Sequence, residues 1–92
     1  MSSGPDDHFR AAADVHTRAF DGETVLVDLK KGDYYGLDPL GAKLWEGVVA
    51  GKTAREVAAA AIADLEVTPE RLLADLVALA GELCERGLLE KV

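Results

Sequence analysis

Asparagine and glutamine are absent from this 92-residue chain, and serine occurs only at Ser2 and Ser3. With no serine in the body of the chain, a serine nucleophile and a carrier-protein serine at the start of a helix are both excluded. The single cysteine, Cys84, cannot form an internal disulfide or a multi-cysteine metal site. A disulfide scaffold and a zinc module are therefore excluded, and the lone thiol fits a reducing compartment.

Positively charged residues are also few. The chain has ten Lys and Arg residues and seventeen Asp and Glu residues, which gives a formal net charge of -7. A nucleic-acid module normally presents a basic face that displaces counterions from phosphates, so we expect no nucleic-acid partner. No apolar run approaches the ~20 residues of a membrane span, and residues 1–10 contain no hydrophobic signal core. We therefore expect a soluble, cytoplasmic protein that does not act at a membrane.

The composition that remains is typical of a folded domain, with 49% hydrophobic and 29% charged residues. The length leaves room for one domain. Residues 1–7 are rich in Ser, Gly, Pro and Asp and offer little apolar material for burial. We expect residues 1–12 to form a flexible N-terminal tail and residues 13–92 to form the domain.

Three short segments have the character of β-strands, over residues 15–20, 23–29 and 33–37. Asp21-Gly22 separates the first two segments and is typical of a type I′ hairpin turn. Alternation of apolar and other residues in the second segment indicates a half-buried strand. The three segments therefore predict an antiparallel meander in chain order.

The loop at residues 30–32, Lys-Lys-Gly, predicts the register of the second hairpin. A three-residue loop closed by glycine in the left-handed region would keep the apolar residues of both strands on one face. The predicted pairs are Leu29 with Asp33, Val27 with Tyr35 and Val25 with Leu37. A two-residue loop would pair Val27 with Gly36 instead, and we prefer the first register because it keeps the apolar set together.

Helical periodicity begins after Asp38, which can cap a helix with Pro39 at its first position. Three helices are predicted, from Pro39 to about Gly51, from a Thr53 capping box to about residue 64, and from Pro69 to about Arg86. The predicted fold class is α+β and winged-helix-like, with a three-stranded antiparallel β-meander followed by a three-helix bundle.

The last predicted helix carries more apolar surface than one core contact needs, because its apolar residues span an arc of roughly 180°. They are Leu72, Leu73, Leu76, Val77, Leu79, Ala80, Leu83 and Cys84. One interpretation packs this helix between the sheet and the other helices. The other makes the edge of the arc one wall of a groove for a partner, with Asp75 at its rim.

The third strand supplies a second binding feature, because it lies at an edge of the meander with unpaired backbone groups. Residues 33–37 contain no proline and one charge, and Gly36 has no side chain to block an approaching backbone. The edge is either covered by the chain's own tail or a dimer partner, or it accepts an extended peptide as an added strand.

The order and spacing of many short motifs resemble the PqqD-like family of RiPP recognition elements, small domains that bind the leader of a ribosomally made precursor peptide. The motifs are Gly32-Asp-Tyr-Tyr-Gly-Leu-Asp38, Gly41-Ala42, Leu44-Trp45, Gly51, Glu56-Val57, Asp75-Leu76 and Gly87-Leu88-Leu89. The Tyr-x-Leu strand, followed by Gly41-Ala42 and the Leu44-Trp45 pair, is most similar to the discrete recognition proteins of lasso-peptide biosynthesis. Asp38 and Leu40 depart from the residues common in the family, Asn and Thr.

The resemblance implies a noncatalytic adaptor that binds a leader by strand addition and delivers the precursor to a separate leader peptidase, a cysteine protease, with a cyclase as a further partner. No cofactor is implied. The expected peptide-binding residues are Asp33, Tyr34, Tyr35, Gly36, Leu37, Leu72, Asp75, Leu76 and Leu79. The alternatives are a PqqD-type peptide chaperone of PQQ biosynthesis and, in another class, a winged-helix DNA-binding regulator.

The remaining candidates for chemistry have simpler structural interpretations. His8 and His16 have no third ligand nearby in the sequence, so we expect no metal site. Cys84 lies in the apolar arc near a helix C-terminus, where the dipole disfavours a thiolate, and we interpret it as a structural thiol. Trp45 at helical spacing is interpreted as a core residue. We identify no catalytic residues in the sequence.

Overall fold

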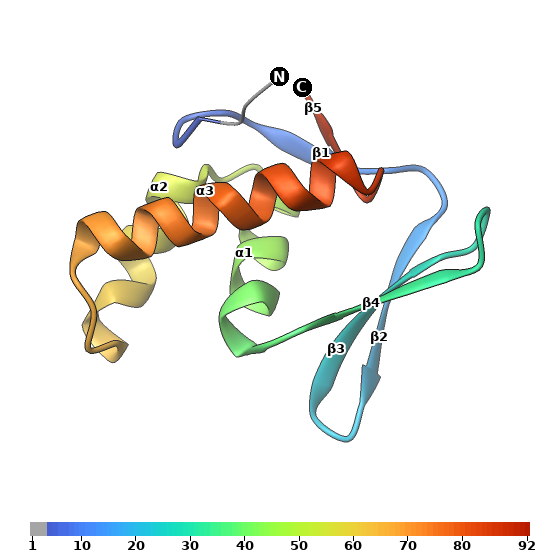
Figure 1. Ribbon diagram of the computed structural model, residues 1–92, viewed down its shortest axis with the longest axis horizontal. Helices are drawn as coiled ribbons and strands as arrows, with labels where there is room; N and C mark the ends of the chain where they lie inside the picture. Colours follow the sequence, from blue (N-terminus) through green and yellow to red (C-terminus); the bar gives the residue numbers. More distant parts are fainter. Residues whose placement is uncertain (1–3) are drawn as a thin grey trace.

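The computed structural model describes residues 4–92 as a three-stranded antiparallel sheet, three helices and a small second sheet that pairs residues 9–11 with residues 89–91 (Figure 1). The strands are β1 (Phe9–Ala11), β2 (Val15–Phe20), β3 (Glu23–Asp28), β4 (Asp33–Leu37) and β5 (Leu89–Lys91). The helices are α1 (Pro39–Val49), α2 (Ala54–Ala61), the 3₁₀ turn η1 (Ile62–Asp64) and α3 (Pro69–Glu85). The α+β class and the meander followed by three helices are confirmed.

The N-terminal segment is ordered further than the sequence indicated, so the prediction of a flexible tail over residues 1–12 is wrong from residue 9 onward. β1 pairs antiparallel with β5, and the Phe9 side chain is 4% exposed in the core. This pairing has no local sequence signal, because β1 is three residues long and its partner strand lies about 80 residues away. Residues 1–3 of the predicted tail lie outside the described residues.

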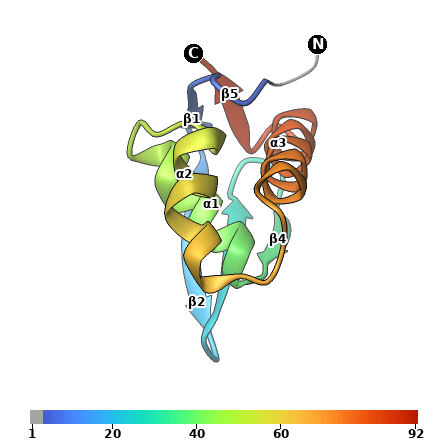
Figure 2. The ribbon, with the colours of Figure 1, turned by 90° about the vertical axis from the view of Figure 1, so that its left-hand side faces the viewer.

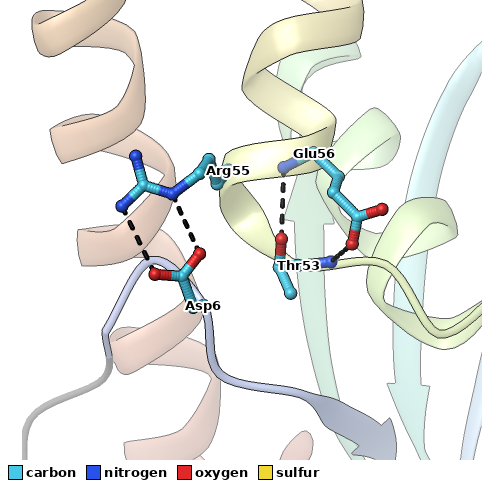
Figure 3. A network of polar contacts seen from close by, with 4 residues as sticks. All are labelled: Asp6, Thr53, Arg55 and Glu56. Atoms are coloured by element: carbon cyan, nitrogen blue, oxygen red, sulfur yellow. Dashed lines mark hydrogen bonds and ion pairs between the residues drawn. The ribbon is translucent and has the colours of Figure 1, made fainter.

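The segment before β1 is also attached to the domain. The Nε and Nη2 groups of Arg55 donate to the two carboxylate oxygens of Asp6, at 2.9 and 3.4 Å (Figure 3). The backbone N–H of Arg55 donates to the carbonyl of Pro5 at 3.1 Å, which satisfies one of the free amides at the start of α2. Lys91 pairs with Asp7 at 3.1 Å. We name residues 4–8 the N-terminal strap.

The first hairpin has the predicted turn. Asp21 and Gly22 both adopt positive φ, 50° and 81°, as a type I′ turn requires, and Phe20 lies opposite Glu23. Asp21 is the only non-glycine residue with positive φ among those described, and aspartate tolerates this conformation better than most residues.

The predicted register of the second hairpin is wrong by one residue on β3. The pairs are Asp28 with Asp33, Val27 with Tyr34, Leu26 with Tyr35, Val25 with Gly36 and Thr24 with Leu37. The loop has four residues because the Asp28 carboxylate accepts the backbone N–H groups of Lys30 and Lys31, and its carbonyl accepts that of Gly32. This turn chemistry outweighs the apolar alternation, so Leu26 faces the core and Leu29 is 58% exposed.

The three helices begin where the sequence predicts, because each N-cap side chain bonds a backbone amide. Asp38 accepts from Gly41 at 2.7 Å, and Thr68 accepts from Arg71 at 3.2 Å. Thr53 and Glu56 form the reciprocal capping box drawn in Figure 3. The glycines after α1 and α3 have φ of 95° and 76°, which suits them to end a helix.

The core lies between the inner face of the sheet and the helices. Figure 2 shows α3 and β4 on one side of the molecule and α2 on the other. The largest fully buried side chains are Leu26, Leu44, Val48, Leu72, Leu76, Leu83 and Leu89. Trp45 is 4% exposed, which confirms it as a core residue. Cys84 is half-buried and packs against this core.

Candidate functional site

β4 is an edge strand of the sheet, whose order is β2-β3-β4. The type I′ turn makes Phe20 and Glu23 a hydrogen-bonded pair, and the N–H of Leu29 donates to the carbonyl of Asp14 at 2.9 Å. The odd-numbered residues of β3 therefore bond β2, and its even-numbered residues bond β4.

The hydrogen-bonded residues of β4 are consequently those opposite the even-numbered residues of β3, namely Asp33, Tyr35 and Leu37. Tyr34 and Gly36 direct their N–H and C=O groups away from the sheet. The register predicted from the sequence also pairs Asp33, Tyr35 and Leu37 with β3, although their partners on β3 differ by one position. No atom of residues 4–92 lies within 4 Å of the position that a Cβ atom on Gly36 would occupy, so the face of the sheet is open at this residue.

Tyr35 connects this edge strand to α3. Its hydroxyl donates to Oε2 of Glu82 at 2.6 Å, and the guanidinium of Arg86 lies 4.9 Å from the centre of its ring. Arg86 also pairs with Glu82 at 3.6 Å. The hydrogen bond to the carboxylate, together with partial burial, raises the pKa of Tyr35 above its usual value of 10.0.

Leu79 lies beside the other end of β4. A Cβ atom placed on Gly41 would stand 3.2 Å from Cδ2 of Leu37 and 3.4 Å from Cδ2 of Leu79. Both leucine side chains therefore lie close to Gly41, at a point where α1 has no side chain.

One stripe of α3 faces β4, because Leu79, Glu82 and Arg86 follow one another at intervals of three and four residues. Asp75 precedes Leu79 by four residues and continues the stripe. This geometry decides which flank of the apolar arc lies next to the edge strand. We name the open edge of β4 together with Asp75, Leu79, Glu82 and Arg86 the β4–α3 site.

A pocket of about 330 Å³ lies at the end of the β4–α3 site where β4 begins and α3 ends. It is lined by Asp28, Lys31, Asp33, Tyr34, Tyr35, Glu85, Arg86 and Leu88. We name it the end pocket. The site as a whole thus has an apolar end, at Leu37 and Leu79, and a charged end at this pocket.

Seven of the nine sequence-predicted residues surround this site. Asp33, Tyr34 and Gly36 are exposed on β4, Tyr35 and Leu79 are half-buried, Leu37 is 5% exposed, and Asp75 is exposed and pairs with Arg71 at 3.5 Å. The assignment of Leu72 and Leu76 to the peptide-binding surface is corrected by the structure, because each residue is 1% exposed. They form the centre of the apolar arc, which faces the core, and only its edge reaches β4.

The sequence analysis did not identify Glu82 and Arg86. Their spacing from Leu79 contained the signal, since residues three and seven positions further along a helix lie on the same side as Leu79. The sequence did not show which edge of the apolar arc faces β4, because helical periodicity does not distinguish one edge from the other.

The β4–α3 site offers backbone hydrogen bonds to an extended chain and a mixed apolar and charged wall for its side chains. Within residues 4–92, no group of three or more His, Cys, Asp or Glu side chains converges as metal ligands do. None of the helices in this part of the chain is long and apolar enough to cross a membrane.

Comparison with known proteins gives one family and two related structures. A model of the coenzyme PQQ synthesis protein D (PqqD) family matches residues 23–89. The structure "TbiB1 in complex with the TbiA(beta) leader peptide" is 31% identical, with a TM-score of 0.79, and the match covers 88% of this chain and 94% of that chain. "Lasso peptide synthetase B1 complexed with the leader peptide" is 25% identical, with a TM-score of 0.85 and coverage of 90% and 98%. A search of curated protein sequences gave no match.

Proposed function

The chain belongs to the PqqD family, and we propose that it is a RiPP recognition element whose β4–α3 site binds the leader of a ribosomal precursor peptide as an added strand. The observation that carries this proposal is the unpaired backbone at Tyr34 and Gly36 beside the α3 stripe. Two structures similar to this chain are complexes with leader peptides, which supports the same occupant here.

The proposed contact residues fall into two groups. On β4, Tyr34 and Gly36 hydrogen-bond the leader backbone, and Asp33, Tyr35 and Leu37 flank it. On α3, the leader side chains meet Asp75, Leu79, Glu82 and Arg86. This division follows strand addition in general, in which main-chain bonds supply affinity and side-chain contacts supply selectivity.

We further propose the setting of this activity. The chain acts as a noncatalytic adaptor in lasso-peptide biosynthesis, in the cytoplasm, and presents the bound precursor to a separate leader peptidase of the cysteine protease class and to a cyclase. The alternative within the family is a peptide chaperone of PQQ biosynthesis, which the name of the matching family model favours. The two are distinguished by whether the leader encoded beside this gene belongs to a lasso precursor or to a PQQ precursor.

Proline substitutions test strand addition, because proline deletes one backbone N–H and fixes φ near ~-65°. Gly36→Pro removes an outward N–H, so we expect it to abolish or strongly reduce binding of the synthetic leader encoded alongside while the fold persists. Tyr35→Pro removes an inward N–H and is expected to break the β3–β4 ladder and lower thermal stability.

Both variants are measured by calorimetric titration and by thermal unfolding. A folded Gly36→Pro variant that binds this leader with wild-type affinity would contradict pairing through Gly36. A wild-type protein that binds neither a lasso-type leader nor a PQQ-type precursor would contradict leader binding altogether.

A further inference from the structure

We infer that the end pocket receives an acidic side chain of the leader and that Arg86 is the residue that selects it. This inference rests on the proposed function and adds the chemistry of one subsite, together with its position relative to an apolar residue of the same peptide.

Arg86 is fixed in place while most of its hydrogen-bonding capacity stays unused. Its guanidinium stacks on the Tyr35 ring at 4.9 Å, and its nearest carboxylate oxygen, on Glu82, is 3.6 Å away. A guanidinium carries five N–H donors in a planar fork that matches a carboxylate. Among residues 4–92 the only charged partner recorded for Arg86 is that one long contact. A positioned arginine with free donors is the arrangement that binds carboxylates in a bidentate manner.

Lys31 adds a second positive charge to the same pocket. Its Nζ atom lies 3.2 Å from the position that a Cβ atom on Gly87 would occupy, so the ammonium group reaches the end of α3. No ion pair within 4 Å joins Lys31 to an acidic residue of the described chain. Two cations therefore line the pocket, Lys31 from the β3–β4 loop and Arg86 from the C-cap of α3.

Three acidic residues, Asp28, Asp33 and Glu85, also line the pocket and outnumber its two cations, so the inference rests on the position and the unused donors of Arg86 and not on the net charge of the pocket. The Asp28 carboxylate is buried and accepts the backbone N–H groups of Lys30 and Lys31. Glu82 accepts the Tyr35 hydroxyl. Asp33 and Glu85 are exposed to solvent, and within the described chain neither lies at ion-pair distance from the two cations.

The geometry of strand addition fixes where the acidic residue stands in the peptide. We take the added strand to be antiparallel to β4. Tyr35 bonds β3, so the leader residue directly opposite it then forms a non-hydrogen-bonded pair, in which side chains lie closest together. That leader side chain faces Arg86. The residue two positions away lies on the same face and meets Leu37 and Leu79. The expected leader pattern is therefore an acidic residue and an apolar residue separated by one position.

A double-mutant cycle with the synthetic leader encoded beside this gene tests the inference. Each acidic leader residue that stands two positions from an apolar residue is replaced by its amide, and Arg86 is replaced by alanine. We expect Arg86→Ala and one amide replacement each to weaken binding about tenfold or more, and the combination to weaken it no further than either change alone. Arg86→Lys keeps the positive charge but lacks the planar guanidinium group, so we expect its affinity to lie between those of Arg86→Ala and the wild type.

Arg10→Ala is the control, because Arg10 is an exposed arginine with an ion pair, to Glu90 at 3.0 Å, that joins β1 to β5 and includes no residue of the β4–α3 site. We expect it to bind as the wild type does. Equal affinities of the Arg86→Ala and Arg10→Ala variants, additive effects in the cycle, or a leader without such an acidic residue would each overturn the inference and leave leader binding intact. A wild-type protein that fails to bind the leader would overturn the proposed function itself.

Discussion

The hydroxyl of Tyr35 donates a 2.6 Å hydrogen bond to Oε2 of Glu82, and this bond ties the open edge strand β4 to helix α3. Because the bond favours the neutral phenol, it raises the pKa of Tyr35 above 10.0. Its contribution to stability is fully present below pH 10 and is lost as the pH rises through the raised pKa.

An ultraviolet absorbance titration measures this coupling. We expect one of the two tyrosines to form its phenolate above pH 10.0, and Glu82→Gln to lower that midpoint because the nearby negative charge is gone. Tyr35→Phe serves as the control and should remove the raised component from the curve. An identical titration curve in the wild type and in Glu82→Gln would show that the two groups are uncoupled in solution.

The N-terminal strap is predicted to loosen in acid. The hydrogen bond from Arg55 lowers the pKa of Asp6, and the backbone N–H of Gly4 together with Lys91 lowers that of Asp7. Groups with lowered pKa values stabilise the folded state above the unfolded value of 3.8 and lose that contribution as the pH falls through the folded value.

Amide hydrogen exchange reports on the strap, because the Arg55 amide bonds the Pro5 carbonyl. We expect its protection factor to fall between pH 6 and pH 3. The Glu56 amide, which bonds the Thr53 hydroxyl within the cap of α2, should keep its protection and is the control. Unchanged protection of the Arg55 amide at pH 3 would show that these carboxylates do not hold the strap.

A charge on the correct flank of α3 should disturb binding, and the same charge on the other flank should not. Leu79→Glu places a carboxylate beside Leu37 and is expected to weaken leader binding by at least about 1 to 2 kcal/mol. Leu73→Glu is the matched control, since Leu73 is also half-buried against the core but lies on the opposite flank. Circular dichroism and calorimetric titration on the same samples separate unfolding from loss of contact. Equal loss of affinity in two folded variants would remove this flank from the site.

Local chemistry explains how much of the fold could be predicted. The caps at Asp38, Thr53 and Thr68 and the Asp21-Gly22 turn depend on residues within four positions, so the sequence shows them directly. The pairing of β1 with β5 depends on contacts about 80 residues apart, and no local pattern indicates it.

The predicted register of the second hairpin is wrong for a different reason. The apolar alternation favoured Val25 and Val27 as core residues, but the Asp28 side chain bonds the loop and shifts the pairing by one position. The shift changes the partners on β3 but not which residues of β4 pair with it, so Tyr34 and Gly36 face outward in both registers. On α3 the periodicity located the apolar arc but not its exposed flank, and the Tyr35 contacts with Glu82 and Arg86 were needed to choose it.

Amide hydrogen exchange along β4, with and without the leader encoded beside this gene, tests strand addition most directly. In the free protein the Tyr35 and Leu37 amides bond β3, whereas those of Tyr34 and Gly36 face the open edge. The account predicts that saturating leader slows exchange at Tyr34 and Gly36 by at least tenfold and changes the rates at Tyr35 and Leu37 much less. Leader binding that leaves Tyr34 and Gly36 exchanging as fast as in the free protein would contradict strand addition at this edge.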